Sequence, residues 1–224
     1  LTVFAKRECS ANWRDELVLL APAAAVLILV SSQTGFSRYF RYALPLLPFL
    51  FVWTSKVARG LRLRRPIIRI AICVALTWSI ASSLSVFPHA LSYFNEVAGG
   101  PRGGPAHLLD ANIDWGQDLL YLKRWIDAHP EAAGLRLAYF GFVDPSLAGI
   151  LAEQPPRQPV DANDSAVTEG PKPGWFAVSI NHLYGYRHAG PEQPYFVYFQ
   201  EFTPVATAGY SIYIYHVTLE QANQ

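Results

Sequence analysis

Three uncharged, apolar runs within the first 88 residues constrain this chain more than any other feature. The runs are "LVLLAPAAAVLILVSS" (residues 17–32), "YALPLLPFLFVWTS" (42–55) and "IAICVALTWSIASSLSVFP" (70–88). A membrane-spanning helix needs about 20 predominantly apolar residues. The runs therefore predict three transmembrane helices, at about residues 17–34, 38–57 and 67–87. The alternative is a helical hairpin buried in a soluble protein, which would leave such a chain little polar surface.

The charge of the chain is divided between two parts. Residues 1–86 hold 11 Lys and Arg against 3 Asp and Glu, whereas residues 87–224 hold 7 against 14. Because the basic part is also the apolar part, the pattern indicates a membrane rather than nucleic acid as the partner. We therefore expect a membrane region over residues 1–87 and a separate domain over residues 88–224.

Basic residues between the runs predict how the chain is oriented. Six of them, and no acidic residue, lie between the second and third runs: Lys56, Arg59, Arg62, Arg64, Arg65 and Arg69. Short cytoplasmic loops are rich in Lys and Arg, so this segment is expected on the cytoplasmic side, as is the basic start of the first run. The turn with Arg38 and Arg41, and everything after Phe87, is then expected outside. This predicts a multi-pass protein of the plasma (inner) membrane with an extracytoplasmic C-terminal domain.

The first residues bear on how much of the protein is present. The chain begins with Leu1 and contains no Met. Its first 16 residues lack the apolar core of a signal peptide. We expect that the chain is part of a longer protein whose N-terminal region is not included.

Residues 88–224 alternate between helical and strand patterns. Residues 114–128 have helical spacing, with Trp115, Leu119, Leu122 and Ile126 on one stripe. Short apolar segments at 135–142, 175–181 and 210–217 predict strands, and Asp144-Pro145 predicts the start of a short helix. The Pro-, Gly- and Asp-rich residues 154–174 predict a surface loop. Together these patterns predict a small α/β domain with helices packed on a sheet.

The stretch "DANIDWGQDLL" (residues 110–120) is the main candidate site. Asp114 followed three residues later by Gln117 is typical of a capping box, and Asp118 in the first helical turn suits the helix dipole. These roles would explain three polar residues without any catalysis.

Capping does not explain Asp110, Asn112 or Gly116 in the same stretch. A glycine in a first helical turn suggests close approach by a ligand or by another backbone, since it costs helix stability. Two interpretations stay open. One is a capped helix start, and the other is a substrate site that includes Asp110, Asn112 and Asp114.

No other motif in the sequence indicates a specific catalytic or metal site. The six histidines fit no usual metal spacing, so no metal site is predicted. A Gly-x-Ser-x-Gly nucleophile motif and a P-loop are both absent from the sequence. The aromatic segments "YFVYFQEF" and "YSIYIYHV" suit either ordinary strand packing or stacking on sugars. Sugar stacking would fit a membrane-anchored binding or sensor module without catalysis.

Three blocks together resemble a known enzyme family. They are "FRYALPLLPFLFV" (residues 40–52), "FPHALSYFNEVAGGPRGG" (87–104) and "LLDANIDWGQDLLYLKRWI" (108–126). They resemble segments of bacterial, polytopic, lipid-carrier-dependent glycosyltransferases of the GT-C class, related to protein O-mannosyltransferases. The resemblance covers about residues 22–151 well and the closing strands more loosely. Ala111 stands where the family often has Ser.

The resemblance implies a membrane enzyme that moves a sugar from a polyprenyl-phosphate carrier to an extracytoplasmic acceptor of unknown identity. In such enzymes the catalytic carboxylate lies in a first external loop, which is not among these residues. The resemblance therefore assigns no general base and no cofactor here, and any divalent metal belongs mainly to that other region. Arg38 and Arg41 are candidates for bidentate binding of a lipid phosphate. The alternative for both is snorkelling to the membrane interface.

Overall fold

The computed structural model describes residues 13–32, 40–62, 65–158, 170–185 and 195–223. It divides the chain into two compact units, Leu1–Ala81 and Ser82–Gln224. The division falls six residues before the boundary at residues 87/88 that the sequence suggests, because the last turn of a long helix belongs to the second unit.

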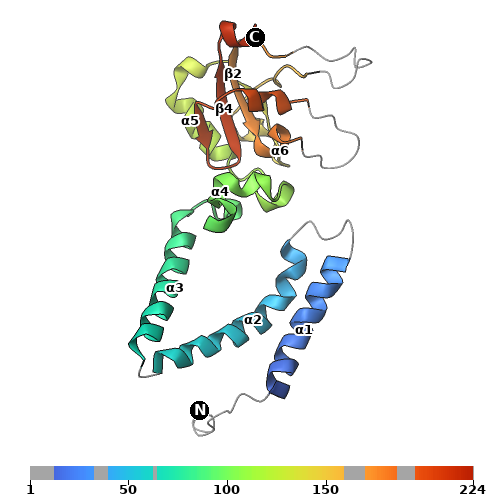
Figure 1. The fold of residues 1–224 in the computed structure, drawn as a ribbon. Helices are drawn as coiled ribbons and strands as arrows, with labels where there is room; N and C mark the ends of the chain where they lie inside the picture. The colour runs from blue at the N-terminus through green and yellow to red at the C-terminus, as the bar shows by residue number, and fades with distance from the viewer. Residues whose placement is uncertain (1–12, 33–39, 63–64, 159–169, 186–194, 224) are drawn as a thin grey trace. The chain divides into compact units, whose positions relative to one another are not determined.

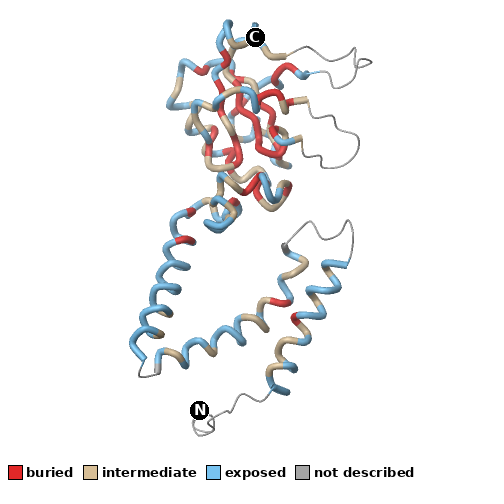
Figure 2. Tube along the Cα trace, in the orientation of Figure 1, coloured by how far each residue is buried: buried red, intermediate tan, exposed pale blue. Residues whose placement is uncertain are grey.

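Two long apolar helices dominate the first part of the chain. They are α1 (Trp13–Ser32) and α3 (Pro66–Ser85), each of 20 residues, and both are long and apolar enough to cross a membrane. A helix of this length measures about 30 Å, which matches the hydrocarbon core of a bilayer. Figure 2 shows that most of both helices is exposed. Most of their apolar surface is therefore left uncovered by the parts of the chain that the structure describes.

The prediction of three spans is wrong, because the middle run does not form a long α-helix. Residues 40–62 instead form the 3₁₀ helix η1 (Phe40–Leu46), the eight-residue α-helix α2 (Leu47–Thr54) and the 3₁₀ helix η2 (Ser55–Arg62). Pro45 lies inside η1 and Pro48 in the first turn of α2. Proline lacks the N–H that a helix interior needs, so the two prolines keep the α-helix from beginning before Leu47. Its eight residues measure only about 12 Å.

The start of α1 lies beside the basic segment that follows α2. The Trp53 indole donates a hydrogen bond to Glu16 Oε2 at 3.0 Å, and Lys56 forms an ion pair with Glu16 Oε1. α1 also packs along η1 and α2. The start of the first run and the basic segment are thus neighbours within the first unit. The side of the membrane on which they lie stays a prediction.

The second unit is built on a four-stranded mixed sheet (Figure 1), which confirms the predicted small sheet. Its strands are β1 (Arg136–Ala138), β2 (Gly174–Ser179), β3 (Ala206–Ala208) and β4 (Ile212–Val217), in the order β1-β2-β4-β3. β1 is parallel to β2, and the other pairs are antiparallel. β1 is shorter than the apolar pattern of residues 135–142 suggests, and β3 was not predicted.

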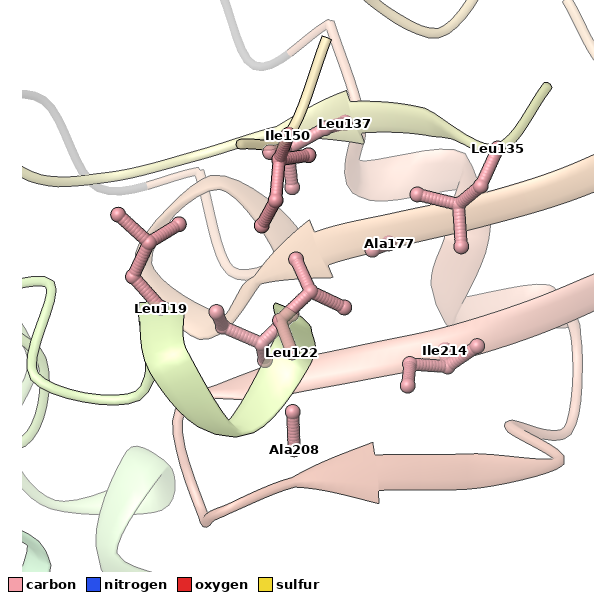
Figure 3. Close-up of a cluster of buried hydrophobic side chains, with 9 residues drawn as sticks. Leu119, Leu122, Leu135, Leu137, Ile150, Ala177, Ala208 and Ile214 are labelled. Carbon is pink, nitrogen blue, oxygen red and sulfur yellow. The ribbon is translucent and has the colours of Figure 1, made fainter. Parts of the chain in front are cut away.

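One face of the sheet is covered by the helix α5 (Leu119–Ala128). Figure 3 shows Leu122 of this helix turned toward Ala177 and Ile214 of the central strands. Leu122, Ala177 and Ile214 are all fully buried. Leu119, Leu122 and Ile126 of the predicted stripe therefore face the core from α5. Trp115 does not, because the helix begins later than expected and Trp115 is 44% exposed before it.

The other face of the sheet is covered by aromatic residues. They come largely from the 3₁₀ helix η9 (Val197–Glu201), and the short helix α6 (Ile180–Leu183) adds Leu183. The Phe199 ring lies 5.2 Å from the rings of both Phe176 and Tyr215, measured between centroids. Much of the aromatic character of the C-terminal region is thus used in a second hydrophobic core.

Short turns make up the remaining elements of this unit. Before α5 the chain forms η3 (Ala90–Ser92), η4 (Glu96–Ala98), α4 (Gly100–Gly103), η5 (Gly104–Ala106) and η6 (Asp110–Asn112). After it come η7 (Pro130–Ala132), η8 (Pro145–Ala148) and α7 (Leu219–Ala222). η8 confirms the helical turn that was predicted after Asp144. Figure 1 shows α4 at the end of this unit where the chain arrives from α3, and the C-terminus at the opposite end.

Candidate functional site

The stretch at residues 110–120 is not a capped helix start. α5 begins at Leu119 rather than at Asp114, and Asp118 holds the N-cap position without a side-chain capping bond. The Gln117 side chain does not reach back to the Asp114 amide. Its Oε1 accepts a hydrogen bond from the Trp115 amide at 2.7 Å. The capping-box prediction is therefore wrong, and these side chains instead hold a turn that precedes the helix.

Gly116 explains why the helix cannot begin earlier. Its φ of +80° lies in the left-handed region, which interrupts a right-handed helix. A Cβ on Gly116 would lie 2.2 Å from Tyr139 Oη and 3.1 Å from Gly141 Cα. The Tyr139 hydroxyl also donates to the Gly116 carbonyl at 3.0 Å. The expected close approach of another backbone at Gly116 is confirmed, and a tyrosine side chain accompanies it.

Asp118 is a buried hydrogen-bonding centre. Its Oδ2 accepts from the backbone amides of Tyr210 and Ser211, both at 3.1 Å, and from the Ser211 hydroxyl at 2.9 Å. The side chain is fully buried. Gly209 in the same turn has a φ of +59°, and a Cβ there would lie 2.1 Å from Asp118 Cγ. Asp118 thus fastens the start of α5 to the turn between β3 and β4.

The other oxygen of Asp118 contacts the segment that follows α3. His89 Nδ1 lies 2.9 Å from Asp118 Oδ1. The His89 ring is packed between two tyrosines, with centroid distances of 4.5 Å to Tyr121 and 5.5 Å to Tyr210. The carboxylate therefore joins three separate pieces of the second unit.

Asp114 is buried with one oxygen satisfied. Its Oδ1 accepts from the Gly116 amide at 2.9 Å, whereas Oδ2 has no hydrogen-bond partner among the described residues. Burial raises the pKa of Asp114 to about 7, and the negative charge of Asp118 adds to this effect. The Gly116 amide is the main opposing influence on this pKa. A carboxyl with this pKa suits acid–base chemistry, but in this conformation Asp114 presents no surface to a substrate.

Asn181, in the helix α6 that follows β2, contacts the backbone of Asp110 and of Asp114. Its Oδ1 accepts from the Asp110 amide at 2.7 Å, and its Nδ2 lies 3.4 Å from the Asp114 carbonyl. Asp110 is buried and has a φ of +63°, a left-handed conformation that Asp tolerates better than most residues. Asn112 is half-buried, and its side-chain amide donates to the Leu109 carbonyl at 2.8 Å.

The structure therefore brings Asp110 and Asp114 together, and it adds residues that sequence reasoning missed. These are His89, Asp118 as an acceptor, Asn181 and Ser211, together with Ser179, whose hydroxyl lowers the pKa of Asp114. The signal for some of them was present, because Ser179 and Asn181 interrupt an apolar strand pattern in "WFAVSIN". A polar residue at a buried strand end needs a hydrogen-bond partner.

The predicted arginine site belongs to the first unit. The Arg41 guanidinium lies over the Tyr42 ring, with Cζ 5.3 Å from the ring centroid. Arg38 lies outside the described residues. Phosphate binding by these two arginines stays a prediction, as does substrate binding by Asp110, Asn112 and Asp114.

A cavity of about 270 Å³ lies elsewhere on the second unit. It is lined by residues of α5 and of the turns near η7 and η8, among them Lys123, Asp127, Gly134 and Leu151. None of the predicted site residues lines it. In the part of the chain that the structure describes, no three His, Cys, Asp or Glu side chains are placed so that they could hold a metal ion.

Comparison with known proteins gives no match to a family model, to a curated protein or to a solved structure. A proposal of function therefore rests on the exposed apolar helices, the buried carboxylate network and the resemblance of the three sequence blocks.

Proposed function

We propose that this chain is the C-terminal part of an integral-membrane glycosyltransferase, in which α1 and α3 lie in the bilayer and the second unit is an extracytoplasmic supporting domain. In this arrangement residues 40–62, which pack along α1 as shorter helical pieces, return the chain to the side where α1 begins. The enzyme transfers a hexosyl group from a polyprenyl-phosphate carrier to an extracytoplasmic acceptor.

Exposed apolar helix surface supports the membrane part of the proposal. Large side chains such as Ile28 on α1 and Val74 and Trp78 on α3 are more than half exposed. Leaving such side chains in water costs about 1.5–3 kcal/mol for each one. A bilayer removes that cost because lipid hydrocarbon replaces water around these side chains. An α-helix can enter the bilayer because its interior backbone groups are satisfied within the helix. This is the single observation that carries the membrane placement.

The buried carboxylates support a structural role for the second unit. Asp118 is enclosed by amide and hydroxyl donors, and Asp114 has no exposed surface. A catalytic carboxylate must come within hydrogen-bond reach of its substrate. These residues are therefore better suited to shaping the domain than to the transfer reaction. This agrees with the implication that the catalytic carboxylate lies in another external loop.

The enzyme class rests on the resemblance of the three sequence blocks alone. Within it, Arg41 is the residue for which we propose a direct role, as a ligand of the phosphate of the lipid carrier. A guanidinium offers paired N–H donors that match a phosphate group. Arg38 would act with it at the same expected membrane face.

The test uses the full-length protein encoded by the gene that contains this chain. The purified protein is reconstituted in liposomes, supplied with polyprenyl-phosphate hexoses, and assayed for release of the unloaded polyprenyl phosphate. This product is formed whatever the acceptor is, so a membrane extract can serve as the source of acceptor. Protein-dependent release supports the transferase. Absence of release with every hexose donor contradicts it.

The same preparation distinguishes the alternative of a binding or sensor module. Saturable binding of a sugar without any release of carrier would favour that alternative. The packing of the aromatic residues weighs against sugar stacking, because Phe196, Tyr198, Phe199 and Tyr215 are buried in the core.

A further inference from the structure

The segment between α3 and η6 exposes apolar side chains at the end of the second unit. Val97 is 98% exposed and Phe87 is 75% exposed. Leu91, Tyr93 and Leu108 in the same segment are also exposed. A soluble surface tolerates single apolar side chains, but a series of them within 22 consecutive residues needs an explanation.

The inner side of this segment is packed firmly against the rest of the unit. The Ser92 hydroxyl is buried and donates to the Ile113 carbonyl at 3.0 Å. Gly104 is buried against Phe94, whose ring would lie 2.4 Å from a Cβ at that position. His89 is held by Asp118, as described above. The exposed side chains therefore project from a fixed platform rather than from a loose linker.

The platform is also fixed to the end of α3. The hydroxyls of Ser82 and Tyr93 lie 3.0 Å apart within hydrogen-bonding distance, and Val86 is buried. Both contacts fall within the second unit. Phe87 follows the last residue of α3 by two positions. The exposed apolar residues are thus continuous with a helix that is long and apolar enough to span a bilayer.

We propose that the exposed apolar side chains of residues 87–108 dock into the lipid interface of the membrane beside the end of α3. The inference rests on the membrane placement proposed above and adds a second membrane contact to it. Apolar side chains bind an interface in proportion to the area they bury, and tyrosine is favoured at this depth. Arg102 and Glu96 are both exposed here, so the charge selects no lipid type, and the contact is apolar.

This docking would have a mechanical consequence for the second unit. A single spanning helix can tilt in the bilayer, and a domain fixed to its end tilts with it. A platform that is embedded next to that helix end removes this freedom. The sheet and its buried carboxylate network would then be held at a fixed height and angle over the membrane surface.

The experiment places a fluorescent reporter on the platform and another far from it. Cys9 and Cys73 are replaced by Ala in the full chain, and a single cysteine is introduced as Val97→Cys or Leu219→Cys. Leu219 is 67% exposed and begins α7, at the opposite end of the unit from α4 (Figure 1). Each variant is labelled with an environment-sensitive dye and reconstituted in phosphatidylethanolamine–phosphatidylglycerol liposomes.

Two quenchers then report the surroundings of each label. Lipids with a nitroxide near the headgroup should quench the label at position 97 several-fold more strongly than the label at position 219. Aqueous iodide should show the reverse order. Equal iodide quenching at both positions would overturn the proposal, as would protection of position 97 from both quenchers, which would mean that protein covers it. Phe87→Cys provides a second platform site with the same expected result.

Native Cys73 separates failure of this inference from failure of the membrane placement. Cys73 is exposed within α3. In the Cys9→Ala chain a label on Cys73 should be quenched by lipids with a nitroxide deep in the acyl chain. If Cys73 is quenched in this way but position 97 is not, the platform proposal is wrong and the membrane placement stands. If neither label is quenched by lipid, both fail.

Discussion

His89 Nδ1 and Asp118 Oδ1 lie 2.9 Å apart although the two residues are 29 positions apart in the chain. The contact joins the segment that follows α3 to the start of α5. Through its other oxygen, Asp118 also holds the turn between β3 and β4. The acidic stretch that invites a catalytic interpretation therefore contains the residue that fastens the second unit together.

Loss of the Asp118 carboxylate should destabilise the second unit strongly. Asp118→Ala leaves two amides, one hydroxyl and His89 without their acceptor, and a cost of about 3 kcal/mol or more is expected. The measurement is thermal unfolding followed by near-ultraviolet circular dichroism. Asp127→Ala is the matched control, since Asp127 pairs with Lys123 in a more exposed position and should cost less than about 1 kcal/mol. Equal losses in the two variants would contradict this role of Asp118.

A side chain at Gly209 should disturb the same contact from the opposite side. Gly209→Ala combines an unfavourable left-handed φ with a Cβ that would lie 2.1 Å from Asp118 Cγ. Gly134→Ala shares the left-handed φ, at +81°, but its Cβ would have no neighbour within 4 Å. The Gly134 variant should lose about 1–2 kcal/mol from the backbone alone. The Gly209 variant should lose about 1–3 kcal/mol more of its free energy of unfolding, as measured by urea unfolding. An equal loss in the two variants would show that the Asp118 side chain can move away from the new Cβ at little cost.

Stability of the second unit should fall as the pH rises toward neutrality. The folded state keeps a proton on Asp114 up to about pH 7, whereas an unfolded Asp releases it near 3.8. Between these values the folded state binds more protons, so the free energy of unfolding should decrease by about 1.4 kcal/mol per pH unit. Above about pH 7 this contribution becomes constant.

The Asp114→Asn variant checks this pH dependence. Asn keeps an acceptor for the Gly116 amide but has no proton to release. Urea unfolding at pH 5, 6, 7 and 8 should therefore show a smaller decline than in the wild type, with the variant the more stable protein at pH 8. Parallel profiles would contradict the expectation. A variant that is stable but inactive in the full-length enzyme would instead place the Asp114 carboxyl in the reaction.

Arg41 should affect use of the lipid donor by the full-length protein. Arg41→Ala should raise the KM for the polyprenyl-phosphate sugar roughly tenfold, because it removes charge-assisted hydrogen bonds to phosphate. Arg41→Lys should restore part of the loss, since it keeps the charge without the paired donors. Arg14→Ala is the control. The Arg14 guanidinium also lies over an aromatic ring, with Cζ 5.6 Å from the Trp13 ring centroid. It is expected at the cytoplasmic face, so its loss should leave the KM unchanged. Reduced protein levels with an unchanged KM would make Arg41 a membrane anchor only.

The overall plan of the second unit could be predicted from sequence because its signals are local. The apolar stripe with Leu119 and Leu122 marks the buried side of a helix, and β2 and β4 are apolar segments of ordinary strand length. β3 could not be predicted in this way. It has three residues, two of them Ala, and it exists because β4 supplies its hydrogen-bond partners.

The prediction that the helix begins at Asp114 is wrong for a physical reason. The Asp114–Gln117 spacing satisfies the capping pattern, but left-handed Gly116 lies between the two residues and prevents the helical turn. A capping box does occur in the chain, at Thr218 and Gln221, where the intervening residues can be helical. The bonds from Asp118 to residues 210 and 211 depend on tertiary folding and leave no local signal.

The prediction of a spanning helix from the middle apolar run is also wrong for a physical reason. Its composition is that of a spanning helix, but Pro45 and Pro48 divide it into shorter helical pieces. Composition reports whether a segment is apolar enough for lipid. It does not report where a missing N–H will break the backbone hydrogen bonding. The prolines therefore deserve more weight than the mean apolarity of the run.

The most direct test of the membrane account is protease accessibility of a C-terminal tag on the full-length protein in intact spheroplasts. The account predicts that the protein remains in the membrane fraction after an alkaline wash and that external protease removes the tag without permeabilisation. A tag that is cleaved only after the membrane is opened would contradict the extracytoplasmic placement of the second unit. Recovery of the protein in the soluble fraction would contradict the placement of α1 and α3 in lipid.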